Sequence, residues 1–171
     1  MRIFDCMMQK VRVYVPLPDR ILELVALLLL VGLLALTAIL YQQAPEQIPT
    51  HFDWNHVPTR WTDKETYWYM AFLFGVMMLL YASSAYNHKM VHLPVRLKAP
   101  VIGLQKKLIS RMCRCTTLCV GMLWLSYLLN TSVSFLEIPL LVHIVEKISL
   151  LLLFAVLIFY SVRIWWVGRK F

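Results

Sequence analysis

Long apolar stretches alternate with short polar segments along the chain. Three stretches without Asp, Glu, Lys or Arg cover residues 24–45, 66–88 and 115–136. Each can cross a hydrocarbon core of about 30 Å at about 1.5 Å per helical residue. A fourth, 148–162, becomes long enough if Arg163 snorkels to the interface. The pattern predicts four membrane spans, at about residues 21–41, 66–87, 113–134 and 144–167.

Composition supports a membrane protein. Of the 171 residues, 60% are hydrophobic and 15% are charged, whereas a soluble domain has about 45–50% apolar and about 25% charged residues. The net charge of +8 would also suit a nucleic-acid binder, but the Lys and Arg residues stand beside the apolar stretches, as membrane anchors do. We expect an all-α polytopic membrane protein with four transmembrane helices in one bundle, in contact with the lipid bilayer and not with nucleic acid.

The distribution of charge predicts an orientation. The flank 1–20, the segment 88–112 and the C-terminal end are rich in Lys and Arg, whereas the segment 42–65 has more acids than bases. The positive-inside rule then places both termini and a basic loop 88–112 in the cytoplasm. The loop 42–65 faces outward. The predicted organisation is a cytoplasmic flank, 1–20, and one membrane domain, 21–171.

Polar residues at the predicted helix ends suggest local partners. Asp19 follows Pro18 and is placed to cap the first helix. Glu23 lies one turn from Arg20, which predicts an ion pair at the interface. Residues 62–65, Thr-Asp-Lys-Glu, fit a capping box before the second span.

The outward loop holds the most distinctive chemistry of the chain. Residues 48–64 read IPTHFDWNHVPTRWTDK, a polar and aromatic segment between two apolar stretches. Its prolines restrict the backbone, so we expect a defined shape and not a flexible tether.

This segment resembles a known family. The run 48–55, Ile-Pro-Thr-His-Phe-Asp-Trp-Asn, followed by Pro58, Arg60-Trp61 and Lys64, is similar to the signature of the bacterial membrane family called domain of unknown function 1648. This chain has His56 where the family usually has Gly. The family includes the N-terminal part of SdpI-type immunity proteins, which protect a bacterium from its own secreted killing factor.

The resemblance implies a multi-pass protein of the bacterial cytoplasmic (inner) membrane, whose outward loop recognises a peptide, lipid or envelope partner in immunity or sensing. Aromatic side chains would provide contact area and polar ones specificity. The candidate recognition residues are Pro49, His51, Phe52, Asp53, Trp54, Asn55, Trp61 and Lys64.

A metal site is an alternative interpretation of the polar residues. His143 and Glu146 have the i, i+3 spacing of carboxylate–histidine sites in helical bundles. With His51 and His56 they would form a ligand set that suits Zn²⁺. The competing interpretation is that His51 hydrogen-bonds the loop backbone, that His143 is an interface residue and that Glu146 pairs with Lys147. We expect no metal and no other cofactor.

Two further functions remain open. A small transporter or transport accessory would use polar residues within the spans, and the candidates are Thr37, Ser126, Asn130 and Glu146. A metal-dependent membrane enzyme would use the histidine set above. The chain shows no Ser-His-Asp order, no paired catalytic carboxylates and no phosphate-binding glycine loop. We therefore expect a protein that is not an enzyme.

Overall fold

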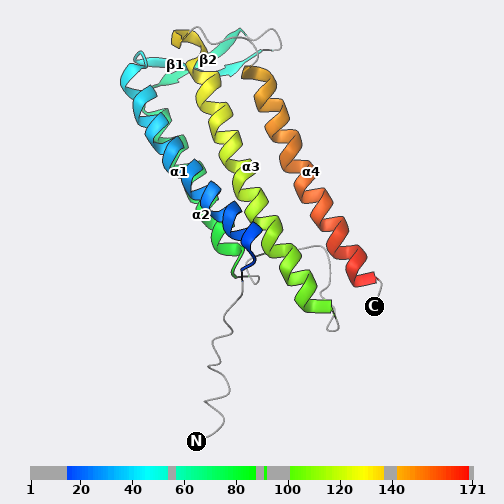
Figure 1. The fold of residues 1–171 in the computed structure, drawn as a ribbon. Helices are drawn as coiled ribbons and strands as arrows, with labels where there is room; N and C mark the ends of the chain where they lie inside the picture. Colours follow the sequence, from blue (N-terminus) through cyan, green and yellow to red (C-terminus); the bar gives the residue numbers. More distant parts are fainter. Residues whose placement is uncertain (1–14, 54–56, 88–90, 92–100, 137–141, 170–171) are drawn as a thin grey trace, which may run out of the picture.

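The computed structural model describes residues 15–53, 57–87, 91, 101–136 and 142–169. Its four helices are all long and apolar enough to cross a membrane, which confirms the predicted all-α, multi-pass fold. A two-stranded hairpin joins the first two helices at one end of the molecule (Figure 1). The elements in chain order are α1 (Leu17–Gln43), β1 (Gln47–Phe52), β2 (Pro58–Asp63), α2 (Thr66–Ser84), α3 (Ile102–Leu136) and α4 (Val142–Arg169).

Helix α3 is the central element. It packs against α1, α2, α4 and the hairpin strand β1, whereas α4 packs mainly on α3 (Figure 1). In its most apolar window 61% of the residues are buried, against 11–17% in the other three helices. The outer helices instead expose large side chains such as Leu28, Phe72 and Leu151, which suits contact with lipid.

The main core lies where α1, α2 and α3 meet. Trp124 and Leu128 of α3 are fully buried against Leu40 of α1 and Tyr67 of α2. Small residues permit this close packing. A Cβ on Gly121 would lie 2.4 Å from a methyl carbon of Leu29, so a larger residue at position 121 would force the Leu29 side chain to shift.

The predicted outward loop contains the hairpin. Its strands are antiparallel, with Ile48 opposite Thr62 and Pro49 opposite Trp61. The next pair is His51 with Arg60, so Thr50 is an extra residue in β1. Such a bulge bends the strand and redirects its side chains. Ile48 is completely buried in the core cluster and anchors the hairpin to the helices.

The predicted capping box before α2 is wrong. The residue at the N-cap is Glu65, which has a helical backbone and makes no side-chain capping bond. Thr62 cannot act as the cap because it belongs to β2, where its hydroxyl accepts a hydrogen bond from Thr66 at 3.2 Å. The strand therefore continues to Asp63, and a short turn leads directly into the helix.

The basic segment 88–112, predicted as a loop, is helical in its second half. Helix α3 begins at Ile102. Gln105, Ile109 and Met112 are buried, while Lys106 and Lys107 are exposed. This spacing gives the segment one buried face at helical periodicity. With 35 residues, α3 is about 52 Å long and exceeds an apolar core of about 30 Å.

Candidate functional site

A cavity of about 730 Å³ opens at the hairpin end, between β1, α2, α3 and α4. Strand β1 forms one wall of this cavity, and the C-terminal half of α3 forms another. Figure 1 shows this end of the molecule, where the hairpin lies across the ends of the helices. The lining residues are Thr50, His51, Phe52, Asp53, Phe74, Leu123, Tyr127, Asn130, Thr131, Glu146, Lys147 and Leu150.

The cavity wall contains polar groups that lack partners. The side-chain amide of Asn130 donates a hydrogen bond to Glu146 of α4. The amide oxygen of Asn130, the hydroxyl of Thr50 and the hydroxyl of Tyr127 are buried and have no hydrogen-bond partner among the described residues. Each unsatisfied buried group costs about 1–3 kcal/mol. These three groups lie together around one cavity, which makes the cavity the candidate site.

Strand β1 and helices α3 and α4 bring these polar groups to the cavity. The β-bulge at Thr50 interrupts the strand next to the cavity. On α3, Tyr127, Asn130 and Thr131 are separated by three and four residues, so they share one helix face. Glu146 is on α4 and faces that surface through its bond to Asn130.

The cavity also has an apolar part. Leu123, Leu150 and the ring of Phe74 belong to its lining. Phe74 and Tyr127 lie 6.4 Å apart between ring centroids, tilted by 43°. Carboxylate, amide and hydroxyl groups thus stand beside an aromatic and aliphatic surface. This composition suits a ligand with a polar group on an apolar body.

The predicted recognition residues do not all lie at the cavity. His51, Phe52 and Asp53 line the cavity. Pro49 is buried in β1, and Trp61 is half exposed on β2. Trp54 and Asn55 lie outside the described residues.

Lys64 lies at the base of the hairpin, where it contacts Glu46. Its ammonium nitrogen lies 3.0 Å from Glu46 Oε1, and its backbone N–H donates to the carbonyl of Glu46 at 3.1 Å. The hydrogen bond with Glu46 raises the pKa of the Lys64 ammonium above its ordinary value. The ammonium also lies 5.7 Å from the centre of the Tyr41 ring. These contacts join the end of β2 to the end of α1, and Lys64 is not among the residues that line the cavity.

Two of the four metal candidates meet at the cavity, since His51 and Glu146 both line it. His56 and the side chain of His143 lie outside the described residues. In the part of the chain that is described, no three His, Cys, Asp or Glu side chains are grouped as metal ligands would be. Glu146 accepts a hydrogen bond from Asn130. No ion pair joins Glu146 to Lys147 in the described part of the chain, since residues adjacent on a helix point in different directions.

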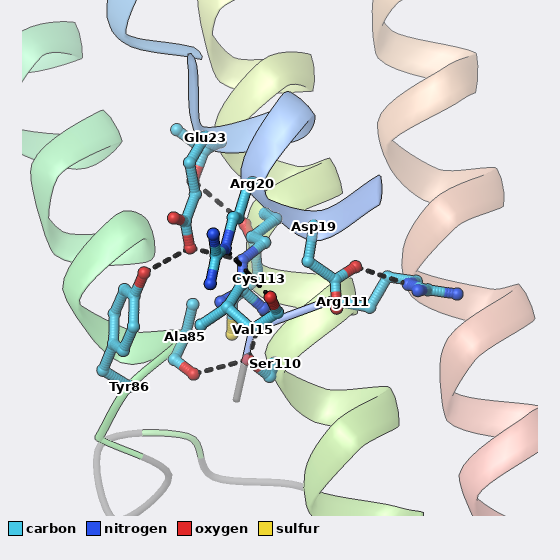
Figure 2. A network of polar contacts seen from close by, with 11 residues as sticks. Val15, Asp19, Arg20, Glu23, Ala85, Tyr86, Ser110, Arg111 and Cys113 are labelled. Atoms are coloured by element: carbon cyan, nitrogen blue, oxygen red, sulfur yellow. Dashed lines mark hydrogen bonds and ion pairs between the residues drawn. The ribbon is translucent and has the colours of Figure 1, made fainter. Parts of the chain in front are cut away.

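A second polar cluster lies at the opposite end of the helices (Figure 2). Asp19 is 2% exposed and accepts a hydrogen bond from Arg111 Nε at 2.8 Å. Asp19 belongs to the first turn of α1, which begins at Leu17 with Pro16 as its N-cap, so the predicted capping role of Asp19 is wrong. Its partner is on α3, 92 residues away.

Glu23 belongs to the same cluster (Figure 2). Its carboxylate accepts a hydrogen bond from Arg114 Nε at 2.7 Å and another from the Tyr86 hydroxyl. The predicted pair of Glu23 with Arg20 does not form, because Arg20 turns back to donate to the carbonyl of Val15 at 3.0 Å.

Hydrogen bonds extend this cluster to the end of α2. A guanidinium N–H of Arg114 donates to the Ser110 hydroxyl, which in turn donates to the carbonyl of Ala85 at 2.6 Å. The cluster connects α1, α3 and the residues after α2 through groups that satisfy one another. Its role is to hold the helices together, in contrast to the unpartnered groups of the cavity.

Sequence reasoning missed several residues of the cavity, including the polar residues Thr50 and Tyr127. Thr50 gave no signal because its place at the cavity depends on the bulge in β1. Tyr127 looked like an ordinary apolar position of a span, although its spacing of three residues from Asn130 was visible. Asn130 and Glu146 were identified, but as isolated polar residues of two spans.

Comparison with protein families gives one match. Residues 28–79 match the model of the family described as Domain of unknown function (DUF1648), which confirms the resemblance inferred from the segment 48–64. The matched residues comprise most of α1, the hairpin and most of α2. Searches of the curated proteins and of the solved structures gave no match.

Proposed function

Because residues 28–79 carry the DUF1648 family segment, we propose that this membrane protein is not an enzyme and recognises a ligand at the hairpin end of its helices. The observation that carries the proposal is the cavity beside the family segment, with three buried polar groups that lack partners. A recognition site has such groups because a ligand satisfies them when it binds.

The proposed location is the bacterial cytoplasmic membrane, with both termini in the cytoplasm. The hairpin end has the acids Glu46, Asp53, Asp63 and Glu65, whereas Lys106, Lys107, Arg163 and Arg169 belong to the opposite half of the helices. Under the positive-inside rule the cavity then opens to the outside, where a secreted or envelope ligand can reach it.

Immunity or sensing is the most concrete form of this function. The ligand is then a secreted peptide, a lipid or an envelope component that presents a polar group and an apolar surface. His51, Phe52 and Asp53 are on both the family segment and the cavity wall, so they would contact the ligand directly.

The immunity form is tested by survival. A bacterium that lacks the protein would express the full chain and be exposed to a panel of secreted membrane-active killing peptides. We expect protection against at least one peptide, and loss of that protection when His51, Phe52 and Asp53 are all changed to Ala. The control is Thr59→Ala, an exposed hairpin position that does not line the cavity. Protection that is equal in the triple variant and the wild type would contradict recognition through this wall.

A transport function is the second candidate, and a polar contact line between α3 and α4 favours it. The Ser126 and Ser149 hydroxyls lie 3.1 Å apart, one turn from the Asn130–Glu146 bond. Thr37, another candidate, instead donates to the carbonyl of Leu33 within its own helix. Substrate flux in proteoliposomes tests this function. Flux that is unchanged in the double variant Asn130→Leu, Glu146→Gln would exclude this route.

A further inference from the structure

We propose that the cavity binds a primary ammonium group carried on an apolar body, with Glu146 and the amide oxygen of Asn130 as its acceptors. This inference rests on the proposed recognition function and names the chemistry that the site recognises. The ammonium can belong to a free amine or to the headgroup of a lipid such as phosphatidylethanolamine.

The hydrogen-bonding groups of the cavity favour a donor ligand. One N–H of the Asn130 side-chain amide is used in the bond to Glu146, and the amide oxygen of Asn130 is an unused acceptor. An amide oxygen can only accept, and a carboxylate can only accept when ionised. The hydroxyl of Thr50 can accept as well. An ammonium group has three donors and no acceptor, so it matches this set.

Charge and aromatic rings favour the same ligand. Glu146 supplies a formal negative charge, and hydrogen bonds between ionised partners are stronger than neutral ones. Asp53 adds a second carboxylate to the lining, although one of its oxygens accepts from the backbone N–H of Val57 at 2.8 Å. The rings of Phe74 and Tyr127 also line the cavity and attract a cation through their faces.

The lining also contains two basic residues, Lys147 and His51. Lys147 is exposed, next to Glu146 in the chain, and residues adjacent on a helix point in different directions. No ion pair within 4.0 Å joins Lys147 to Glu146 in the described part of the chain. The carboxylate of Glu146 therefore forms no direct ion pair with Lys147 among the described residues.

The test measures binding of 2-phenylethylamine to the full-length protein in phosphatidylcholine nanodiscs, by ligand-observed NMR titration and by the shift of the unfolding midpoint. Phosphatidylcholine has no N–H donor, so it does not supply the proposed group. The comparison probes are 2-phenylethanol and phenylacetate, which carry the same ring without the ammonium. We expect that only the amine binds and stabilises the protein.

Variants locate the binding to the cavity. Glu146→Gln keeps the shape of the side chain and removes its charge, and should weaken amine binding about 10- to 100-fold. Glu65→Gln removes an exposed acid at the same end of the molecule, outside the cavity, and should leave binding unchanged. Equal binding of amine and alcohol, or equal amine affinity in Glu146→Gln and the wild type, would overturn the proposal.

Two further comparisons complete the test. The first distinguishes a lipid headgroup from a free amine, and the second distinguishes the ammonium assignment from the broader recognition function. If the ligand is a lipid headgroup, nanodiscs that contain phosphatidylethanolamine should stabilise the wild type, but not Glu146→Gln, and should compete with 2-phenylethylamine. If it is a free amine, this lipid should have no effect on either measurement. If the triple wall variant loses protection in the survival experiment but no amine binds, recognition stands and the ammonium assignment fails.

Discussion

Glu23 and Arg114 form an ion pair whose two partners differ in burial. The side chain of Arg114 is 5% exposed and that of Glu23 is 34% exposed. Removing one partner leaves the other charge uncompensated, and the cost depends on whether the remaining charge reaches solvent. A carboxylate at the rim can rehydrate, whereas a buried guanidinium cannot.

Replacing Glu23 and replacing Arg114 should therefore lower the free energy of unfolding by unequal amounts. Glu23→Gln leaves Arg114 buried without a counter-charge and should lower the unfolding free energy by about 3 kcal/mol. Arg114→Gln should cost about 1–2 kcal/mol, because Glu23 remains partly in contact with solvent. The control Arg20→Gln should stay within about 0.5 kcal/mol. Unfolding of the purified variants in lipid nanodiscs measures all three, and a larger loss in Arg114→Gln than in Glu23→Gln would contradict this reading.

Contacts between residues that are distant in the sequence explain why the predicted partners of Asp19 and Glu23 were wrong. Asp19 and Glu23 were assigned partners within four residues, since neighbours are all that a local pattern offers. Their arginine partners on α3 are 92 and 91 positions away. Arg111 and Arg114 had been counted only as cytoplasmic anchors. Nothing in the spacing of either segment shows that these two turns face each other.

Ile48 is a fully buried residue that attaches the hairpin to the helices. Ile48 has no exposed surface and joins the cluster of Tyr67, Trp124 and Leu128. The opposite face of β1 at Gln47 is exposed. The wall of the cavity begins two residues later at Thr50, so the position of that wall follows from the position of Ile48.

Ile48→Ala should loosen the hairpin. Truncation of a buried Ile to Ala costs about 2–5 kcal/mol, and the strand should then move away from α3. We expect faster proteolysis within residues 47–63 and weaker ligand binding, measured by limited digestion and by titration. Gln47→Ala, at the neighbouring exposed position, should change neither. Equal digestion rates in the two variants would show that Ile48 does not hold the strand.

Helices were more predictable than strands. Apolar length identifies a membrane helix without any knowledge of its neighbours, and each predicted span corresponds to a helix of suitable length and hydropathy. The hairpin was described only as a restricted loop, because Pro49 and Pro58 argue against regular strands. Both prolines occur in a short, bulged pair whose irregular ladder tolerates them.

At the scale of the molecule, α3 joins both polar centres. Its N-terminal half carries Arg111 and Arg114, and its C-terminal half carries Asn130 and Thr131 of the cavity. The remaining helices expose mostly apolar side chains. If the positive-inside rule holds, the two centres lie on opposite sides of the membrane.

Labelling with a membrane-impermeant maleimide tests this orientation. The four native cysteines, Cys6, Cys113, Cys115 and Cys119, would first be changed to Ala. A cysteine at the exposed position Thr59 should react in intact spheroplasts, because the hairpin faces outward. A cysteine at the exposed position Lys107 should react only after the membrane is permeabilised. The reverse pattern would invert the proposed topology.

The boundary of the family match has a consequence for gene fusion. Residues 28–79 end before α3, yet their buried side chains Leu40, Ile48 and Tyr67 pack around Trp124 and Leu128 of that helix. The core of the matched segment is thus completed by a helix that lies further along the chain. A chimera that keeps this segment and exchanges everything after it must provide a new central helix with a large ring at the depth of Trp124. Without such a helix, the hairpin of the chimera lacks the apolar surface against which Ile48 packs.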